Sequence, residues 1–342
     1  WLAARWGGRR LLGLTLLAAV LAVLGTAAAP SVGWLVVAAV AMGVASGVLN
    51  VALSIEAIAV ERALGRPVMA TLHGTWTLGA VAGGAAVTTS LHHGVGVQAL
   101  MTTGATAVAV AMLLTGTRLR GLPGADGPPA ARVAQEPAPL QPRVVVMLGV
   151  VGAAAFITEG AATDWAGVHA TRVLGADAAT GSLVYTVFFV AMTLVRFVGD
   201  AVRARAGAVT SIRLAGWTAT AGAGLVLLSG ELPGPPQAGI ACAIAGWALA
   251  GAGMAVVWPI VTSTLGAAGI GAQRLSAVTT ISYGGGLVGP AVIGYVAGTA
   301  TLPAALIIPA VLALLVATVA PRLLGTMLQA RTPDRPSVLQ SG

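Results

Sequence analysis

Lysine is absent from the 342 residues of the chain, so its 18 basic side chains are all arginines. Cysteine is nearly absent too: Cys242 stands alone, which excludes an internal disulfide framework and a cysteine-rich metal site. Charged residues make up only 8% of the chain, whereas a soluble domain has roughly 25%. These shortages exclude an ordinary soluble globular protein.

The sequence also lacks the short motifs that carry much enzymatic chemistry. It contains no glycine-rich phosphate loop, no HExxH motif, no paired-cysteine site and no G-x-S-x-G elbow. His92 and His93 are adjacent, and neighbouring side chains point apart on most backbones, so they do not indicate a metal site. We therefore expect no enzyme activity, no cofactor and no bound metal.

Apolar sequence is abundant instead: 57% of the residues are hydrophobic and the mean hydropathy is +0.92. A helix needs about 20 mostly apolar residues to cross a bilayer, and glycine and proline are tolerated within it. The pattern predicts an all-α polytopic membrane protein. The expected spans are residues 11–29, 34–55, 68–91, 97–116, 144–164, 180–199, 211–230, 238–262, 276–298 and 302–321.

The arginines are unevenly distributed between the ends of these spans. If the spans alternate in direction, nearly all arginines fall on one side, and only Arg172 falls on the other. Arginine accumulates in the cytoplasmic loops of membrane proteins. The sequence therefore predicts a multi-pass protein of the cytoplasmic membrane, with both chain ends inside. The same bias explains the net charge of +8 without a nucleic-acid partner.

Two short basic stretches, residues 2–10 and 199–207, occupy equivalent places about 200 residues apart. Each stretch is followed by four apolar spans, but only the second stretch is also preceded by two apolar spans of its own half. This pattern predicts a duplicated protein with 4 + 6 of an expected 6 + 6 helices, the first two being missing. The expected parts are a first bundle (1–116), a proline-rich cytoplasmic linker (117–143), a six-helix second bundle (144–321) and a disordered cytoplasmic tail (322–342).

Both basic stretches resemble the loop between helices 2 and 3 of the major facilitator superfamily, usually written G-x-L-a-D-R-x-G-R-R. The first stretch has Ala4 at the position of the acid, whereas the second keeps the acid as Asp200. Arg196 and Asp200 are four residues apart, which on a helix favours a local ion pair. The resemblance implies a cytoplasmic gate, and plain topology is the alternative. Its residues would be Arg5, Gly7, Arg9, Arg10, Arg196, Gly199, Asp200 and Arg203.

Three further stretches, Asn50–Gly79, Glu159–Trp165 and Tyr283–Gly294, resemble a bacterial branch near the fucose-type sugar permeases. That branch includes poorly characterised inner-membrane proteins. The resemblance implies two bundles related by a pseudo-two-fold axis and a central cavity that opens alternately to each side. The ten spans would correspond to helices 3–12 of the family.

Ionisable side chains within spans are costly, so each is a candidate for a functional site. Glu159, on an otherwise apolar span, is the first candidate for binding and releasing a proton. Glu56 is a second, with pairing to an interfacial arginine as its alternative. Asp164 is a third, although an acid at the end of a helix beside a membrane-interface tryptophan would also explain it.

Other polar and aromatic residues within spans are candidates for lining a substrate cavity. His73 and Trp76 share one helix face, where an imidazole could bond a hydroxyl group and an indole could stack on a ring. Packing within the membrane is the alternative for each candidate. The full set is Asn50, His73, Trp76, Tyr185, Trp247, Trp258 and Tyr283.

Glycines spaced by four residues allow membrane helices to approach closely, and a mid-span Gly-Pro pair supplies a kink or hinge. The candidates are Gly79, Gly83, Gly289, Pro290 and Gly294.

Taken together, these features predict a secondary transporter that moves a small solute by alternating access and is coupled to protons. Sugar-like uptake and drug-like efflux both remain open, and the scarcity of charge within the spans argues against a strongly charged substrate. The expected partners are the solute, protons and the lipid bilayer, with no obligate protein partner. The alternatives are an inactive truncated remnant and a membrane receptor or scaffold that does not transport.

Overall fold

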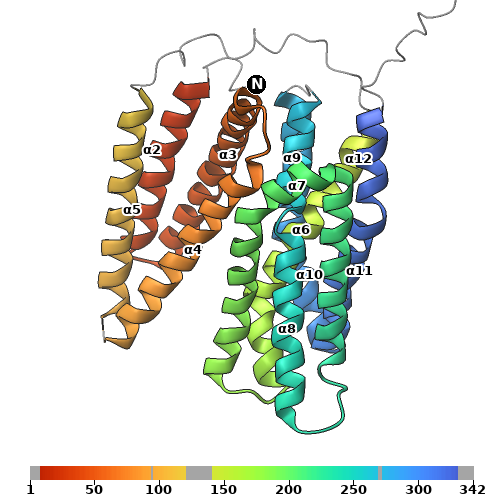
Figure 1. The fold of residues 1–342 in the computed structure, drawn as a ribbon. Coiled ribbons are helices and arrows are strands. Elements are labelled where there is room, and N and C mark those ends of the chain that lie inside the picture. The colour runs from red at the N-terminus through yellow and green to blue at the C-terminus, as the bar shows by residue number, and fades with distance from the viewer. Residues whose placement is uncertain (1–7, 94, 121–140, 269–271, 330–342) are drawn as a thin grey trace, which may run out of the picture. The chain divides into compact units, whose positions relative to one another are not determined.

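A computed structural model describes residues 8–93, 95–120, 141–268 and 272–329, and over these residues it contains helices and no strand (Figure 1). Contacts divide it into two units. Unit 1 contains most of α3, the part of α4 from Gly79 onward, and α2 and α5. Unit 2 contains Leu64–Leu78, which includes the start of α4, and nearly all of the later helices.

The helices follow the apolar spans of the sequence. Those of the first part are α2 (Gly8–Ala27), α3 (Val32–Leu64), α4 (Met69–His92) and α5 (Val97–Arg120). Those of the second part are α6 (Pro142–Val168), the π-helical turn η2 (His169–Val173), α7 (Ala178–Leu228), α8 (Pro236–Met254), α9 (Val257–Ala267), α10 (Ala272–Thr299), α11 (Leu302–Thr318) and α12 (Ala320–Gln329).

Seven helices in the described ranges are long and apolar enough to cross a membrane, which confirms the all-α polytopic class. The longest, α7, contains two expected spans, 180–199 and 211–230. They are separated at Gly207, whose φ of 79° and ψ of 163° lie outside the helical region. A positive φ suits glycine because it has no Cβ, so the second basic stretch ends in a kink at this residue.

Unit 1 has a small apolar core. Leu12 and Ala19 of α2 pack with Ala45 and Leu49 of α3, and Met112 of α5 lies against this cluster. Figure 1 shows α2 and α5 side by side.

In unit 2, glycines bring helix backbones together. A Cβ added at Gly149 of α6 would lie 2.7 Å from Ile281, and one at Gly289 would lie 2.8 Å from Ile157, so α6 and α10 are in close contact. Gly294 lies beside Trp165, and α10 remains helical through Pro290. By contrast, a Cβ at Gly79 or Gly83 of unit 1 would meet no described atom within 4 Å, so the close approach expected there stays a prediction. In so glycine-rich a chain, spacing alone does not identify a contact.

The chain after residue 321 differs from expectation. Residues 322–329 belong to α12, which continues α11 into one apolar segment, Leu302–Leu328, because the sequence stays apolar beyond Pro321. The rest of the expected tail, 330–342, and most of the expected linker, 121–140, lie outside the described residues.

Candidate functional site

Helices α6 and α7 pack side by side in unit 2, and the side that they share, called the groove below, carries Asp164, Glu159 and Arg196. Glycines permit the contact at the η2 end, where a Cβ on Gly181 would lie 2.9 Å from Thr171 and 3.2 Å from the carbonyl oxygen of Gly167. Polar groups can be followed from this end of the groove toward the kink at Gly207.

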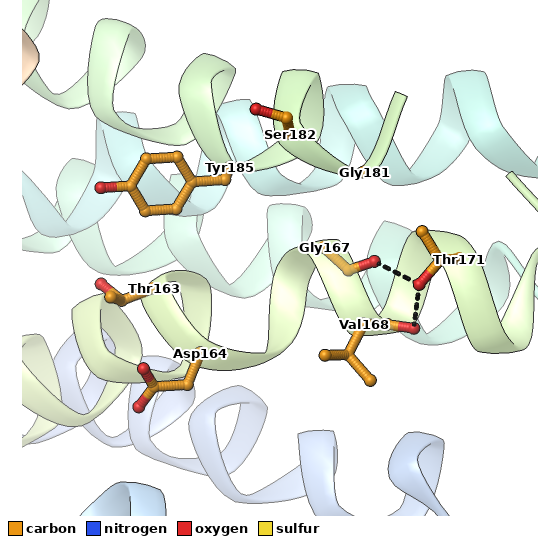
Figure 2. A pocket seen from close by; sticks show the side chains of 8 residues that line it. All are labelled: Thr163, Asp164, Gly167, Val168, Thr171, Gly181, Ser182 and Tyr185. Carbon is orange, nitrogen blue, oxygen red and sulfur yellow. Dashed lines mark hydrogen bonds between the residues drawn. The ribbon is translucent and has the colours of Figure 1, made fainter. Parts of the chain in front are cut away.

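A pocket of about 330 Å³ lies at the η2 end of the groove. In Figure 2, α6 and η2 contribute one wall and the first turns of α7 contribute the other. Asp164 and Tyr185, which the sequence suggested for different roles, both line it. The complete lining is Thr163, Asp164, Gly167, Val168, Thr171, Gly181, Ser182 and Tyr185.

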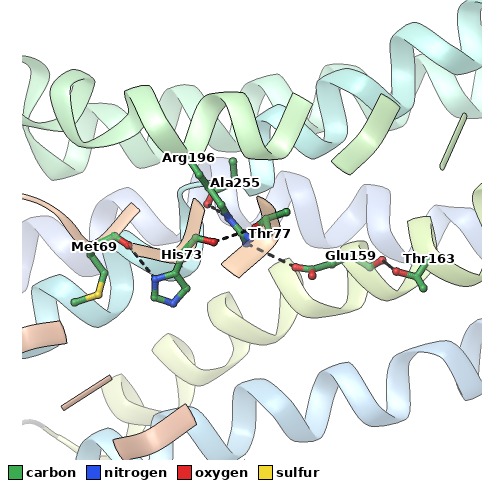
Figure 3. Close-up of polar contacts among 7 residues, drawn as sticks. All are labelled: Met69, His73, Thr77, Glu159, Thr163, Arg196 and Ala255. Carbon is green, nitrogen blue, oxygen red and sulfur yellow. Dashed lines mark hydrogen bonds and ion pairs between the residues drawn. The ribbon is translucent and has the colours of Figure 1, made fainter. Parts of the chain in front are cut away.

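One turn of α6 away from this pocket, the carboxylate of Glu159 faces the guanidinium of Arg196 on α7 (Figure 3). Glu159 Oε2 and Arg196 Nη2 are 3.7 Å apart. The side chain of Arg196 is only 7% exposed, and that of Glu159 is 30% exposed. Thr163 Oγ1 donates to the backbone oxygen of Glu159 at 2.8 Å, so this face of α6 leads from the ion pair to the pocket.

Two more acceptors hold Arg196. Its Nη1 donates to the hydroxyl of Thr77 on α4, and its Nε donates to the backbone oxygen of Ala255 at 3.1 Å. Thr77 in turn donates to the backbone oxygen of His73 at 3.0 Å. A buried guanidinium needs such acceptors because losing its water is costly. Arg196 therefore joins α4, α6, α7 and the junction between α8 and α9.

The sequence provides the free carbonyl at this junction. In a continuous helix the oxygen of Ala255 would accept from the backbone nitrogen four residues later, which is Pro259. Proline has no N–H, and its ring disfavours a close carbonyl at that position. The helix is interrupted between Met254 and Val257, and the oxygen of Ala255 accepts from Arg196 instead.

One turn further along α7, the buried carboxylate of Asp200 caps the start of α4. Its Oδ1 accepts from the backbone N–H of Ala70 at 3.0 Å, and its Oδ2 accepts from that of Thr71 at 2.7 Å. The first N–H groups of a helix have no partner within the helix, and an anion there is also favoured by the helix dipole. The ion pair expected between Arg196 and Asp200 is not formed, because each group binds another helix.

Two glycines allow α7 to reach these partners. A Cβ on Gly199 would lie 2.5 Å from Val256 and 3.4 Å from the Cβ of Ala70. A Cβ on Gly74 of α4 would lie 3.2 Å from the Cβ of Arg196. Larger residues at these positions would separate α4 from α7.

Aromatic residues surround the ion pair on the α9 and α10 side. The rings of Phe156 and Tyr283 are centred 4.5 Å apart, and Trp258 lies 5.3 Å from Phe156 and 6.0 Å from Tyr283. Tyr283 interacts electrostatically with both Glu159 and Arg196. Of the expected cavity residues, Tyr283 therefore lies beside the expected proton site, and Trp258 belongs to the same aromatic cluster as Tyr283.

Comparisons with known proteins support one family. No protein-family model matches the chain. It is 30% identical over 302 residues to a Sinorhizobium fredii protein named "uncharacterized transporter y4wD", a match that covers 86% of this chain and 75% of that protein. It is 31% identical over 284 residues to an "uncharacterized MFS-type transporter" of Yersinia pestis, covering 82% of this chain and 70% of that one. The chain belongs to the major facilitator superfamily (MFS).

A solved structure agrees with this MFS assignment at the level of the fold. The Escherichia coli fucose:proton symporter FucP superposes with a TM-score of 0.63 at 14% sequence identity. The superposition covers 97% of this chain and 86% of that one.

The other expected site residues of this MFS chain belong to unit 1, to the core of unit 2 or to residues that the structure does not describe. Asn50 of α3 donates to the backbone oxygen of Ser46 at 3.1 Å, and Glu56 is exposed on the same helix. Trp247 is buried against Phe188, with ring centres 6.2 Å apart. Arg5 and Gly7 lie outside the described residues, and only the helical backbone of Arg9 and Arg10 is described.

Three expected residues lie beside the network. His73 shares a hydrogen bond of 2.9 Å with the backbone oxygen of Met69. Trp76, three residues further along α4, is 58% exposed. Arg203 follows Asp200 on α7 and is half-buried.

The sequence interpretation missed Thr77, the oxygen of Ala255 and the amide groups that Asp200 caps. Thr77 could have been found, because it lies four residues after His73 on one face of α4. The free oxygen of Ala255 could also have been found from Pro259. The capped amides carry no sequence signal of their own. In the part of the chain that the structure describes, no group of three or more metal-ligating side chains occurs.

Proposed function

We propose that the chain is a proton-coupled secondary transporter that moves a small solute across the cytoplasmic membrane by alternating access. The observation that carries this proposal is the contact between Glu159 and Arg196, in which the arginine is also bonded to α4 and to the junction of α8 and α9. Membrane transporters use buried carboxylates as proton relays.

Proton binding at Glu159 would act on the network through charge. A protonated carboxyl group no longer attracts the guanidinium of Arg196, whereas the bonds to Thr77 and Ala255 remain. The two groups are 3.7 Å apart, beyond hydrogen-bond distance, so their attraction is electrostatic, on the order of 1 kcal/mol for a partly exposed pair. Its loss can change the ratio of two conformations by roughly fivefold, since each 1.4 kcal/mol is a factor of ten.

Asp200 would act as the latch of this transporter. In the two-bundle arrangement proposed from the sequence, α4 belongs to residues 1–116 and α7 belongs to residues 144–321. The bonds from Ala70 and Thr71 to Asp200 would have to break whenever these bundles separate on that side. We assign this side to the cytoplasm because the arginine-rich loops lie there, and we propose that both ends of the chain lie inside.

Proteoliposomes loaded with a pH-sensitive dye test the proposal. Sugars and organic amines are added outside in turn, and the internal pH is followed. A solute carried with protons changes the internal pH of wild-type vesicles. Glu159→Gln should abolish this change and keep solute exchange, because the neutral amide cannot bind and release a proton.

Glu231→Gln is the matched control, because Glu231 is an exposed acid in the loop between α7 and α8. It should behave as the wild type does. A pH change that persists in Glu159→Gln contradicts the role of Glu159. Wild-type vesicles that pass no added solute favour a receptor, scaffold or inactive remnant.

A further inference from the structure

The pocket between α6, η2 and α7 has a chemistry of its own that the ion pair does not use. Asp164 lines it with an exposed carboxylate that has no hydrogen bond or ion pair among the described residues. No arginine or histidine is among the described lining residues. A bound ligand can therefore meet a carboxylate with no compensating positive group in the pocket wall.

The hydroxyl groups of the pocket add more acceptors than donors. Thr163 donates its hydroxyl proton to the backbone oxygen of Glu159 at 2.8 Å. Thr171 donates its hydroxyl proton to the backbone oxygen of Gly167 at 2.9 Å (Figure 2). Their oxygens remain able to accept. With the carboxylate of Asp164, three lining groups favour a ligand rich in donors.

The remaining polar groups can adapt to a ligand. The hydroxyls of Ser182 and Tyr185 have no hydrogen-bond partner among the residues described, and each can donate or accept. The ring of Tyr185 also offers a face to a cation. The volume of about 330 Å³ is near the lower end of the roughly 300–1,000 Å³ of ligand sites, which favours a small ligand.

We propose that this pocket binds a small hydroxylated amine, with its ammonium group against Asp164 and its hydroxyl groups toward Ser182 and Tyr185. An ammonium group has three donors and no acceptor, which complements the acceptor-rich wall. A charge-assisted hydrogen bond is roughly twice as strong as a neutral one, so the amine is favoured over a neutral sugar of the same size. A single positive charge also complements Asp164, the one acid among the described lining residues.

The proposal refines the proposed transport function, because the same face of α6 leads from the pocket to Glu159 one turn away. In this arrangement the pocket is the first binding site on the path, and Glu159 is the proton site behind it. The two roles belong to different residues and can be separated by experiment.

Equilibrium binding to the purified full chain in detergent tests the pocket directly. The probes are glucosamine and galactosamine, each compared at about pH 6 with its parent sugar, glucose or galactose. Each pair differs by one ammonium group in place of a hydroxyl. At least one amine should bind about tenfold more tightly than its parent sugar.

Asp164→Asn should remove this preference, raising the Kd of the amine about tenfold and changing that of the sugar less than twofold. Ser182→Ala should weaken both members of a pair, and serves as a second pocket variant if Asp164→Asn fails to fold. Glu231→Gln should change neither. Equal affinity for amine and sugar, a preference that survives Asp164→Asn, or no saturable binding of either amine would overturn the proposal.

The outcome is distinguishable from that of the transport proposal. Glu159→Gln should keep amine binding while it abolishes the coupled pH change. Amine binding without any solute flux in the wild type would support the pocket proposal and contradict the transport proposal. Proton-coupled flux of neutral solutes without amine binding would support the transport proposal and contradict the pocket proposal.

Discussion

The guanidinium of Arg196 lies 3.7 Å from the carboxylate of Glu159, and the two side chains differ in how firmly they are held. Arg196 is buried and bonded to two other groups, while nearly a third of the side-chain surface of Glu159 is exposed. In the proposed transporter, Glu159 would therefore be the partner that exchanges a proton while Arg196 keeps its place.

The coupling between these two residues is measurable by a double-mutant cycle. Arg196→Gln should lower the free energy of unfolding by about 1–3 kcal/mol. The reason is that Thr77 and the backbone oxygen of Ala255 lose the donor groups of Arg196, and the carboxylate of Glu159 loses its charged partner. Glu159→Gln should cost less. If the pair interacts as the structure indicates, the double variant should cost less than the sum by about 1 kcal/mol, measured by denaturant unfolding in detergent. Strict additivity would mean that the pair contributes nothing.

The cap at the start of α4 predicts a second effect. Asp200→Ala removes the acceptor of two amide groups and should destabilise the protein by about 1 kcal/mol, as the loss of a helix cap does. Amide hydrogen exchange should accelerate at Ala70 and Thr71, because their N–H groups lose their partner.

Asp200→Asn separates the hydrogen bond from the charge in this cap. It keeps one carbonyl acceptor, so its exchange rates should lie between those of the wild type and the alanine variant. Unchanged exchange at Ala70 and Thr71 in both variants would show that Asp200 does not cap α4 in solution.

The hydrogen bond from Arg196 to the backbone oxygen of Ala255 predicts that Pro259 affects the coupling of protons to solute. Pro259→Ala supplies an N–H that competes with Arg196 for the oxygen of Ala255. Because residue 259 is in the first turn of α9, stability should change by less than about 1 kcal/mol. The solute-driven pH change should fall several-fold in proteoliposomes.

A second proline provides the control. Pro309 lies inside α11, which supplies none of the hydrogen-bond or ion-pair partners of Arg196 among the described residues. Pro309→Ala should therefore leave the coupling ratio of protons to solute unchanged even if it alters stability. An equal loss of coupling in both variants would assign the effect to helix geometry in general.

Much of this organisation could be predicted from the sequence, because span length, arginine placement and scarce charge are local properties. Glu159, Tyr283 and Trp258 become candidates in this way, as polar or aromatic groups in apolar helices, and their role stays a prediction. The partners of Arg196 and Asp200 could not be found so directly. A local spacing of four suggested that they pair with each other, whereas helix packing gives each a partner far along the chain. The pocket was missed as a unit because Asp164 and Tyr185 meet only through the pairing of α6 with α7.

The cap of α7 predicts a pH dependence outside the membrane spans. Asp177 accepts from the backbone N–H of Thr180 at 2.7 Å, and this hydrogen bond lowers the pKa of the Asp177 carboxyl. A lowered pKa in the folded state means that the cap stabilises α7 above the ordinary aspartate pKa of about 4 and loses this effect as the pH falls through the lowered value. Carboxyl NMR should place the midpoint of Asp177 below that ordinary value. Asp177→Asn should keep a cap without this acid-dependent loss, and an unshifted midpoint in the wild type would refute the cap.

Close packing of α7 on α8 predicts opposite effects at two glycines that are two positions apart in the sequence. A Cβ on Gly222 would lie 2.5 Å from the backbone oxygen of Gly246, so Gly222→Ala forces the helices apart and should cost about 1–3 kcal/mol. A Cβ on Gly224 would meet nothing within 4 Å. Gly224→Ala should be neutral or should stabilise by up to about 1 kcal/mol, because alanine is the better helix former. Thermal unfolding of both variants in one detergent measures the difference. Similar losses at both positions would mean that helix packing does not set the requirement for glycine.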